Sequence, residues 1–205
     1  MIKIICVCGA RPNFMKIAPL MEEYELHPEI EPLLVHTGQH YDEKMSKVFF
    51  DDLELPKPHF YLGIGSGSHA EQTGKIMMEF EKILLQEKPD IVLVVGDVNS
   101  TLACSVVAKK LSIDVAHVEA GLRSFDRKMP EEINRVVTDA LSDYLFTPSP
   151  DGDENLLKEG IARGKIYLVG DIMVDSLMFN LEQARQTNIL QSLGLRTSTD
   201  DSPPS

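Results

Sequence analysis

Short apolar runs rich in β-branched residues alternate with stretches of helical periodicity along almost the whole chain. The continuous apolar runs predict strands buried on both faces, whereas the 3.6-residue period predicts helices. The expected strands are Ile2–Cys8, Pro32–Thr37, Ile91–Val95, Val115–Glu119, Tyr144–Thr147 and Ile166–Val169. The expected helices are Met15–Glu25, Asp42–Phe50, His69–Glu87, Ser100–Leu111, Glu131–Ser142, Gly152–Glu159 and Met173–Ala184.

This alternation is typical of an α/β protein with a doubly wound, mostly parallel, Rossmann-like sheet. We expect one domain over residues 1–186 and a C-terminal tail over residues 187–205. The end of that tail, Thr197–Ser205, has the composition of a disordered segment. The Pro- and Gly-rich segment Leu53–Ser68 has two open interpretations, a mobile flap or a plain surface connection.

Composition narrows the class of protein. The 205 residues are 43% hydrophobic and 25% charged, which suits a soluble domain with a sizeable core. A formal net charge of −12 argues against nucleic acid or an anionic membrane as partner, but a small anionic ligand needs only local cations. Met1–Cys8 has no signal-peptide pattern and no apolar stretch could span a bilayer, so we expect a cytoplasmic protein. Cys6, Cys8 and Cys104 are interpreted as buried thiols.

The exit from the first expected strand could hold phosphate. Gly9 permits a sharp turn and Pro12 suits the first turn of a helix. Free N–H groups at a helix start, with Arg11 and Lys16 nearby, would form an anion site, although solvated surface charges are the alternative. The segment matches neither the dinucleotide-binding nor the Walker A glycine pattern.

Two carboxylates follow later strands. Asp97 comes directly after Ile91–Val95 and Gly96, and it could equally cap the next helix. Glu119 ends the expected strand Val115–Glu119. Unless a cation or ligand meets it, burial would raise the pKa of Glu119 toward the range of a usable acid or base. Arg123 and Arg135 are its expected partners, so a structural salt bridge stays an alternative.

A third candidate carboxylate lies in the first turn of an expected helix. Glu131 follows Pro130 in the first turn, and Arg135, four residues later, shares its face. We expect Glu131 to point toward the strand ends and Glu132 to be rotated away from them. An ordinary surface pair of Glu131 with Arg135 is the alternative.

The histidines carry weaker signals. His40, beside Gln39 and Tyr41, is read as a structural loop residue in preference to a ligand contact, and His117 as a satisfied core residue. No His, Asp and Glu residues cluster at metal-ligand spacing, and no Ser-His-Asp pattern is present. The sequence therefore predicts neither a metal site nor a serine nucleophile.

Five segments resemble, in order, the non-hydrolysing UDP-N-acetylglucosamine 2-epimerases. They are Gly9-Ala10-Arg11-Pro12 with Lys16, Gln39-His40-Tyr41, Gly96-Asp97 with Asn99-Ser100-Thr101, His117-Val118-Glu119-Ala120-Gly121-Leu122-Arg123, and Pro130-Glu131-Glu132-Ile133-Asn134-Arg135. Val169-Gly170-Asp171 and Val174-Asp175 are similar to the family's next strand-to-helix junction. The likeness extends from residue 2 to about residue 185, and the fourth and fifth segments are its most specific parts.

The resemblance implies a fold and a reaction. Residues 1–186 would be the Rossmann-like N-terminal domain of an epimerase, one half of a glycosyltransferase-B-like architecture, with the second Rossmann-like domain absent from this chain. The implied reaction interconverts UDP-N-acetylglucosamine and UDP-N-acetylmannosamine by elimination of UDP to a 2-acetamidoglucal and re-addition. It uses no metal and no redox cofactor. The resemblance also implies a homodimer that buries part of the helix His69–Glu87.

The motif match assigns roles to residues. Elimination needs a base at C2, an acid at the departing anomeric oxygen and positive charge on the diphosphate. Proton transfer is expected from Asp97, Glu119 and Glu131. Substrate and phosphate contacts are expected from Arg11, Lys16 and Arg135.

Two other functions stay open. Members of the family are roughly twice this long, and their second half supplies a histidine and most uridine contacts. The chain is therefore also consistent with a nucleotide-sugar-binding domain without turnover. A UDP-sugar glycosyltransferase shares the two-domain architecture, but three carboxylates at strand ends favour proton transfer over group transfer.

Overall fold

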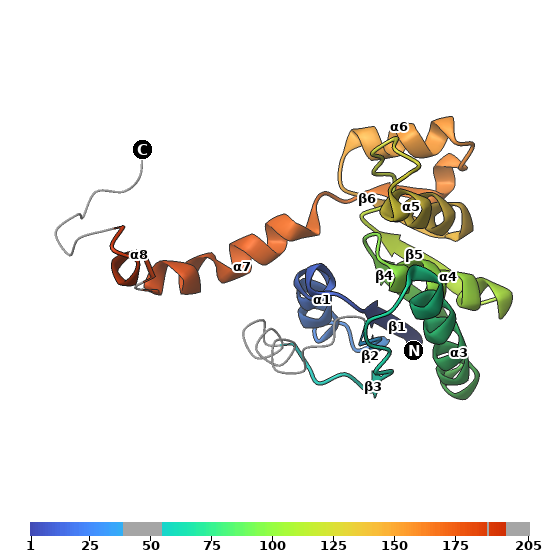
Figure 1. The fold of residues 1–205 in the computed structure, drawn as a ribbon, viewed down its shortest axis with the longest axis horizontal. Coiled ribbons are helices and arrows are strands. Elements are labelled where there is room, and N and C mark those ends of the chain that lie inside the picture. The colour runs from blue at the N-terminus through green and yellow to red at the C-terminus, as the bar shows by residue number, and fades with distance from the viewer. Residues whose placement is uncertain (39–54, 188, 196–205) are drawn as a thin grey trace.

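A computed structural model describes residues 1–38, 55–187 and 189–195 (Figure 1). In these ranges a seven-stranded sheet has the order β3-β2-β1-β4-β5-β6-β7, and every neighbouring pair of strands is parallel. The strands are β1 (Ile2–Cys8), β2 (Ile30–His36), β3 (Phe60–Tyr61), β4 (Ile91–Val95), β5 (Asp114–Val118), β6 (Tyr144–Thr147) and β7 (Ile166–Leu168). The expected doubly wound α/β class is confirmed, and the strand order reverses between β1 and β4.

Helices cover both faces of the sheet. They are α1 (Arg11–Tyr24), α3 (His69–Glu87), α4 (Asn99–Lys110), α5 (Pro130–Leu141), α6 (Pro150–Lys158), α7 (Ile172–Gln186) and the short α8 (Ile189–Ser192), with a 3₁₀ turn η1 (Arg163–Lys165). One core lies between the sheet and α3 with α4, where Phe80 and Cys104 are buried. A second lies beneath α1, where Phe14 packs with Cys6 and Cys8. All three cysteines are buried and unpaired, as predicted.

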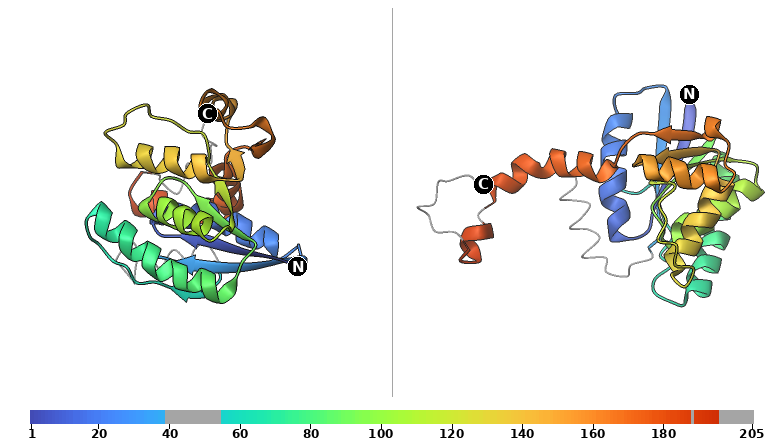
Figure 2. Two further views of the ribbon diagram at one scale, coloured as in Figure 1. Left: turned by 90° about the vertical axis from the view of Figure 1, so that its right-hand side faces the viewer. Right: turned by 90° about the horizontal axis from the view of Figure 1, so that it is seen from above.

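The last long helix leaves this body. Helix α7 contacts α1, and the Ser176 hydroxyl donates to the Met15 carbonyl oxygen. Beyond that contact α7 points away from the sheet (Figure 1 and the right view of Figure 2). In the described ranges no helix combines the length and apolarity that crossing a membrane requires.

Most predicted elements match the structure, and the differences have local causes. Helix α1 begins at Arg11, four residues before the expected Met15, because the Asn13 side chain binds the turn in front of the helix. Strand β5 ends at Val118, so Glu119 lies outside the strand. The segment Leu53–Ser68 contains the short strand β3, which its Pro and Gly content concealed. The expected helix Asp42–Phe50 and the His40 loop lie outside the described residues.

One glycine pair sets the approach of α6 to the sheet. Gly121 follows β5 with φ of +80°, a conformation that favours glycine. A Cβ atom there would lie 2.4 Å from the Gly152 carbonyl oxygen in α6. The backbones therefore touch directly, and the loop after β5 is held against α6.

Gly121→Ala should lower the free energy of unfolding by about 2–4 kcal/mol, because collision with Gly152 adds to the strain of positive φ. Gly160→Ala is the matched control, since Gly160 has φ of +87° but open space around its Cβ position. Gly160→Ala should lower the free energy of unfolding by about 1–2 kcal/mol, from backbone strain alone. Urea unfolding of both variants measures the difference. Equal losses would contradict the contact with Gly152.

Candidate active site

The candidate site lies where β1, β4 and β5 end on one edge of the sheet. These three strands are adjacent, and the direction of winding reverses between β1 and β4. Ligand sites of open α/β sheets lie at such reversals, outside the carboxyl ends of the strands. The turns after β4 and β5 carry Asp97 and Glu119, and α1 after β1 carries Arg11 and Lys16.

The start of α1 is fixed against the end of β4 by Asn13. Its side-chain oxygen accepts from the backbone N–H groups of Gly9 (3.1 Å) and Ala10 (3.0 Å), and its amide nitrogen donates to the Val95 carbonyl oxygen (3.1 Å). Sequence reasoning missed Asn13, although an Asn three residues after a helix start is a possible capping signal.

The resulting position of α1 buries one basic residue and exposes another. Lys16 is only 8% exposed, whereas Arg11, the first residue of the helix, lies on the surface. The structure thus keeps both cations at this edge of the sheet but gives them different surroundings.

Glu119 and Lys16 form an ion pair. The carboxylate oxygen Oε2 accepts from the Lys16 Nζ beside Gly96, where an added Cβ would lie 3.0 Å from Nζ and 3.3 Å from Oε2. Glu119 has φ of +72°, a strained conformation for a residue with a Cβ atom. Its backbone N–H and that of Ala120 both donate to the Phe146 carbonyl oxygen. The expected partners Arg123 and Arg135 are therefore wrong for Glu119.

Asp97 pairs with Arg135 across the neighbouring turn. Asp97 Oδ2 lies 2.5 Å from Arg135 Nη2, and the Asn134 amide donates to the Asp97 carbonyl oxygen at 2.8 Å. Helix α4 has Val98 as its N-cap and no side-chain cap bond, so Asp97 is not a capping residue. The side chains of Asp97 and Glu119 keep 28% and 22% of their surface exposed, so a ligand can reach both.

The two glutamates that open α5 have different surroundings. Glu132 is 2% exposed and accepts from the Ser124 N–H, the Ser124 hydroxyl, the Phe125 N–H and Arg135. Burial alone would raise the pKa of Glu132, but these hydrogen bonds hold it below its ordinary value of 4.5. Glu131 is half-buried, and its side chain makes no hydrogen bond or ion pair with any described residue. The alternative of a Glu131–Arg135 surface pair is wrong, because Arg135 binds Glu132 and Asp97.

Arg123 forms ion pairs with residues that surround and support the site. Its guanidinium lies 2.7 Å from Asp139 Oδ2 and donates twice to Glu159, the C-cap of α6, at 2.8 and 2.6 Å. Asp139 also contacts His117 Nδ1 at 2.6 Å. His117 is fully buried with both ring nitrogens bonded, which confirms its interpretation as a satisfied core residue. Asp139 was missed, although it follows Glu132 and Arg135 at helical spacing.

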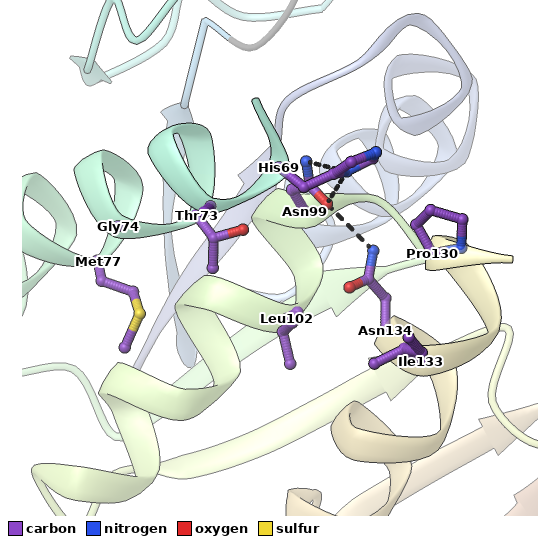
Figure 3. Close-up of a pocket in the computed structure, with 10 residues that line it drawn as sticks. His69, Thr73, Gly74, Met77, Asn99, Leu102, Pro130, Ile133 and Asn134 are labelled. Atoms are coloured by element: carbon purple, nitrogen blue, oxygen red, sulfur yellow. Dashed lines mark hydrogen bonds between the residues drawn. The ribbon is translucent and has the colours of Figure 1, made fainter. Parts of the chain in front are cut away.

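A pocket of about 440 Å³ lies between α3, α4 and α5, next to the turn that carries Asp97 (Figure 3). Its apolar part includes Met77 and Leu102, and its polar end is formed by His69, Asn99 and Asn134. Asn99 Oδ1 lies 3.2 Å from His69 Nδ1 and 3.4 Å from the Asn134 amide nitrogen. No Lys, Arg, Asp or Glu lines it, so a diphosphate would find its counter-charges at the strand ends and not here.

The strand ends combine the groups that proton transfer beside an anion requires. Lys16 and Arg135 offer N–H donors, and Glu119 and Asp97 offer carboxylate oxygens. If an anionic ligand bound Lys16 and Arg135, it would replace the carboxylates as partners of these two cations. The carboxylates would then lie unpaired beside the ligand. Among the described residues, no three His, Cys, Asp or Glu side chains are grouped to hold a metal ion.

Comparison with known sequences decides the family. The family model described as UDP-N-acetylglucosamine 2-epimerase matches residues 22–199. The chain belongs to this family. A UDP-N-acetylglucosamine 2-epimerase homolog of Methanococcus maripaludis is 55% identical over 94% of this chain and 54% of its own length. A UDP-2,3-diacetamido-2,3-dideoxy-D-glucuronate 2-epimerase of Pseudomonas aeruginosa is 44% identical over 97% of this chain and 59% of its own.

A solved epimerase structure matches the fold. The UDP-GlcNAc 2-epimerase of Methanocaldococcus jannaschii, in complex with UDP-GlcNAc and UDP, superposes with a TM-score of 0.90 and 51% sequence identity. The match covers 94% of this chain and 53% of the solved one. The fold of this epimerase-family chain is thus one half of a glycosyltransferase-B-like architecture, and the chain spans about half the length of the curated relatives it matches.

Glu132→Gln should lower stability at pH 7 by about 1–3 kcal/mol, because buried donors lose their charged acceptor. The folded-state pKa of Glu132 lies below 4.5, so its contribution is complete above about pH 4.5 and is lost as the pH falls through the folded-state value. The difference in the free energy of unfolding between wild type and variant should therefore become smaller in acid, as measured by urea unfolding at a series of pH values. Glu154→Gln, at an exposed pair with Lys158, should change stability by less than about 0.5 kcal/mol at any pH. A gap that widened in acid would contradict the role of the Glu132 carboxylate.

Proposed function

We propose that this chain carries the proton-transfer half of a UDP-N-acetylglucosamine 2-epimerase. The whole protein would interconvert UDP-N-acetylglucosamine and UDP-N-acetylmannosamine by eliminating UDP to a 2-acetamidoglucal and adding it back. One observation carries the proposal: the ion pairs Lys16–Glu119 and Asp97–Arg135 lie on adjacent turns at the point where the sheet reverses. In a member of this family, we expect the nucleotide sugar to bind at this position.

Diphosphate binding would change the partners of the cations. Lys16 and Arg135, with Arg11 at the start of α1, would turn toward the phosphate oxygens, which accept more hydrogen bonds than a carboxylate. The backbone N–H groups that begin α1 would add to this positive field. Neutralising the diphosphate makes UDP a better leaving group, which is the electrostatic part of the catalysis.

The released carboxylates would then move the protons. Removal of the C2 proton and protonation at the departing anomeric oxygen are opposite tasks, so at least two carboxyl groups are required. Glu119 and Asp97 border the cations directly, and Glu131, which makes no bond with the described residues, is free to complete the set. Return of the proton to the opposite face of C2 before UDP adds back would give the epimer.

The substrate is proposed from the majority of the named relatives. The Pseudomonas aeruginosa relative acts, by its name, at C2 of a diacetamido uronate, so C2 chemistry is common to both substrates. Incubation with each sugar nucleotide in heavy water distinguishes them, since deuterium at C2 appears only in the sugar that is turned over. Binding of UDP-sugars by calorimetry without exchange would favour a binding domain, and transfer that depends on an acceptor would favour a glycosyltransferase.

A homodimer is part of the proposal. Met78 and Leu85 lie seven residues apart on one side of α3 and are 59% and 58% exposed. A second copy packed against this helix would cover them. Sedimentation equilibrium should give twice the monomer mass, and Met78→Lys with Leu85→Lys should give the monomer mass. A wild-type monomer at micromolar concentration would contradict the dimer.

Glu119→Gln should slow deuterium incorporation at C2 of UDP-N-acetylglucosamine by about 10²–10⁴-fold, because it removes a group that can exchange protons. Binding of UDP, measured by calorimetry, should be kept. Glu79→Gln is the control, since Glu79 lies on the surface of α3 and contacts Lys82. Exchange at the wild-type rate in Glu119→Gln would remove Glu119 from the mechanism, and no exchange in the wild type would remove the reaction.

A further inference from the structure

The turn that carries Asp97 is held by a buried histidine. His117 on β5 places Nε2 2.8 Å from the Gly96 carbonyl oxygen. The Gly96 N–H donates to the Val118 carbonyl oxygen at 3.1 Å. Both polar groups of Gly96 are thus bound to β5, so the residue just before Asp97 has a defined orientation.

The turn that carries Glu119 is held by the partner of that histidine. Asp139 on α5 contacts His117 Nδ1 with Oδ1 at 2.6 Å and accepts from the Gly121 N–H with Oδ2 at 3.1 Å. Glu119 lies between His117 and Gly121 and has positive φ. A conformation of this kind persists only where the surroundings enforce it. The bonds on both sides of Glu119 supply that enforcement.

The charged groups of this arrangement pair with one another and not with the catalytic carboxylates. The Gly96 carbonyl can only accept, so His117 Nε2 is a donor. Burial alone would raise the pKa of the Asp139 carboxyl, but the charge and hydrogen bond of His117, followed by those of Arg123, hold it below its ordinary value. The charged groups around His117 are Asp139 from α5, Arg123 from the loop after β5 and Glu159 at the C-cap of α6.

We propose that His117 and Asp139 are positioning residues that set the orientation of Glu119 relative to Asp97. The proposal rests on the proposed function, because it assigns these carboxylates to proton transfer. It differs from a purely structural role, since one imidazole–carboxylate pair binds both turns. Removing it should misplace the reacting groups while the diphosphate cations Lys16 and Arg135 keep their places.

The kinetic test uses Asp139→Asn. Exchange of the C2 proton should lose about 10- to 100-fold in kcat, the scale of a misplacement near 1 Å, with KM within about twofold of wild type. Thr138→Val is the matched control: Thr138 is equally buried on the same helix, and its hydroxyl has no hydrogen-bond partner among the described residues. Phe80→Leu, in the core beneath α3, controls for loss of stability alone. Both controls should keep kcat. A kcat unchanged in Asp139→Asn, or lowered equally in Phe80→Leu, would overturn the proposal.

A second measurement does not depend on activity. In ¹H–¹⁵N spectra, Asp139→Asn should shift the amide signals of Gly96, Glu119 and Gly121 and leave those of distant turns, such as Lys88, in place. In the wild type, a long-range ¹H–¹⁵N spectrum should find Nε2 of His117 protonated, because it faces the Gly96 carbonyl oxygen, and this measurement applies even if the variant does not fold. An unprotonated Nε2, or unmoved turn signals, would overturn the positioning role. Absence of C2 exchange in the wild type, with these signals as expected, would instead overturn the proposed function and leave the pair as a clamp on the two turns.

Discussion

The ion pair between Lys16 and Glu119 is the contact on which the candidate site depends, because it joins the first helix to the turn after β5. It can form only because Gly96 leaves room beneath it and because Asn13 sets where α1 begins. The neighbouring pair, Asp97 with Arg135, has the same composition. Two carboxylates and two cations therefore share one edge of the sheet without a large net charge, even though the chain as a whole carries −12.

The surrounding polar network explains how such an edge remains ordered. Glu132 binds the loop after β5 through Ser124 and Phe125, and Arg123 joins that loop to α6. These groups are buried and bonded, so they add rigidity where apolar packing cannot reach. The residues that remain accessible, among them Glu119, Asp97 and Glu131, are the ones with oxygen atoms left for a ligand. A stiff frame and a few reachable charged groups are what a preorganised site requires.

Much of this could be predicted from the sequence. The apolar runs gave β1, β4 and β6 residue for residue, and their ends located the edge that carries Asp97 and Glu119. The pairing of charges could not be predicted, because it depends on contacts between distant segments. Lys16 meets Glu119 across 103 residues, and Arg123 turns to Glu159 across 36. Strand β3, two residues in a Pro- and Gly-rich segment, gave no period to detect. The family followed from motifs, and the roles of the site residues rest on the proposal.

The topology also affects how the chain is made. Strand β1 occupies the middle of the sheet, with β2 on one side and β4 on the other, where Ile4 lies opposite Ile91. On a ribosome, residues are added at about 5–20 per second, so one margin of this apolar strand stays uncovered for several seconds after it emerges. Uncovered strands of this kind are where newly made chains associate wrongly. Strand β4 covers the second margin of β1, so any delay in its synthesis should make chaperone binding more important for this protein.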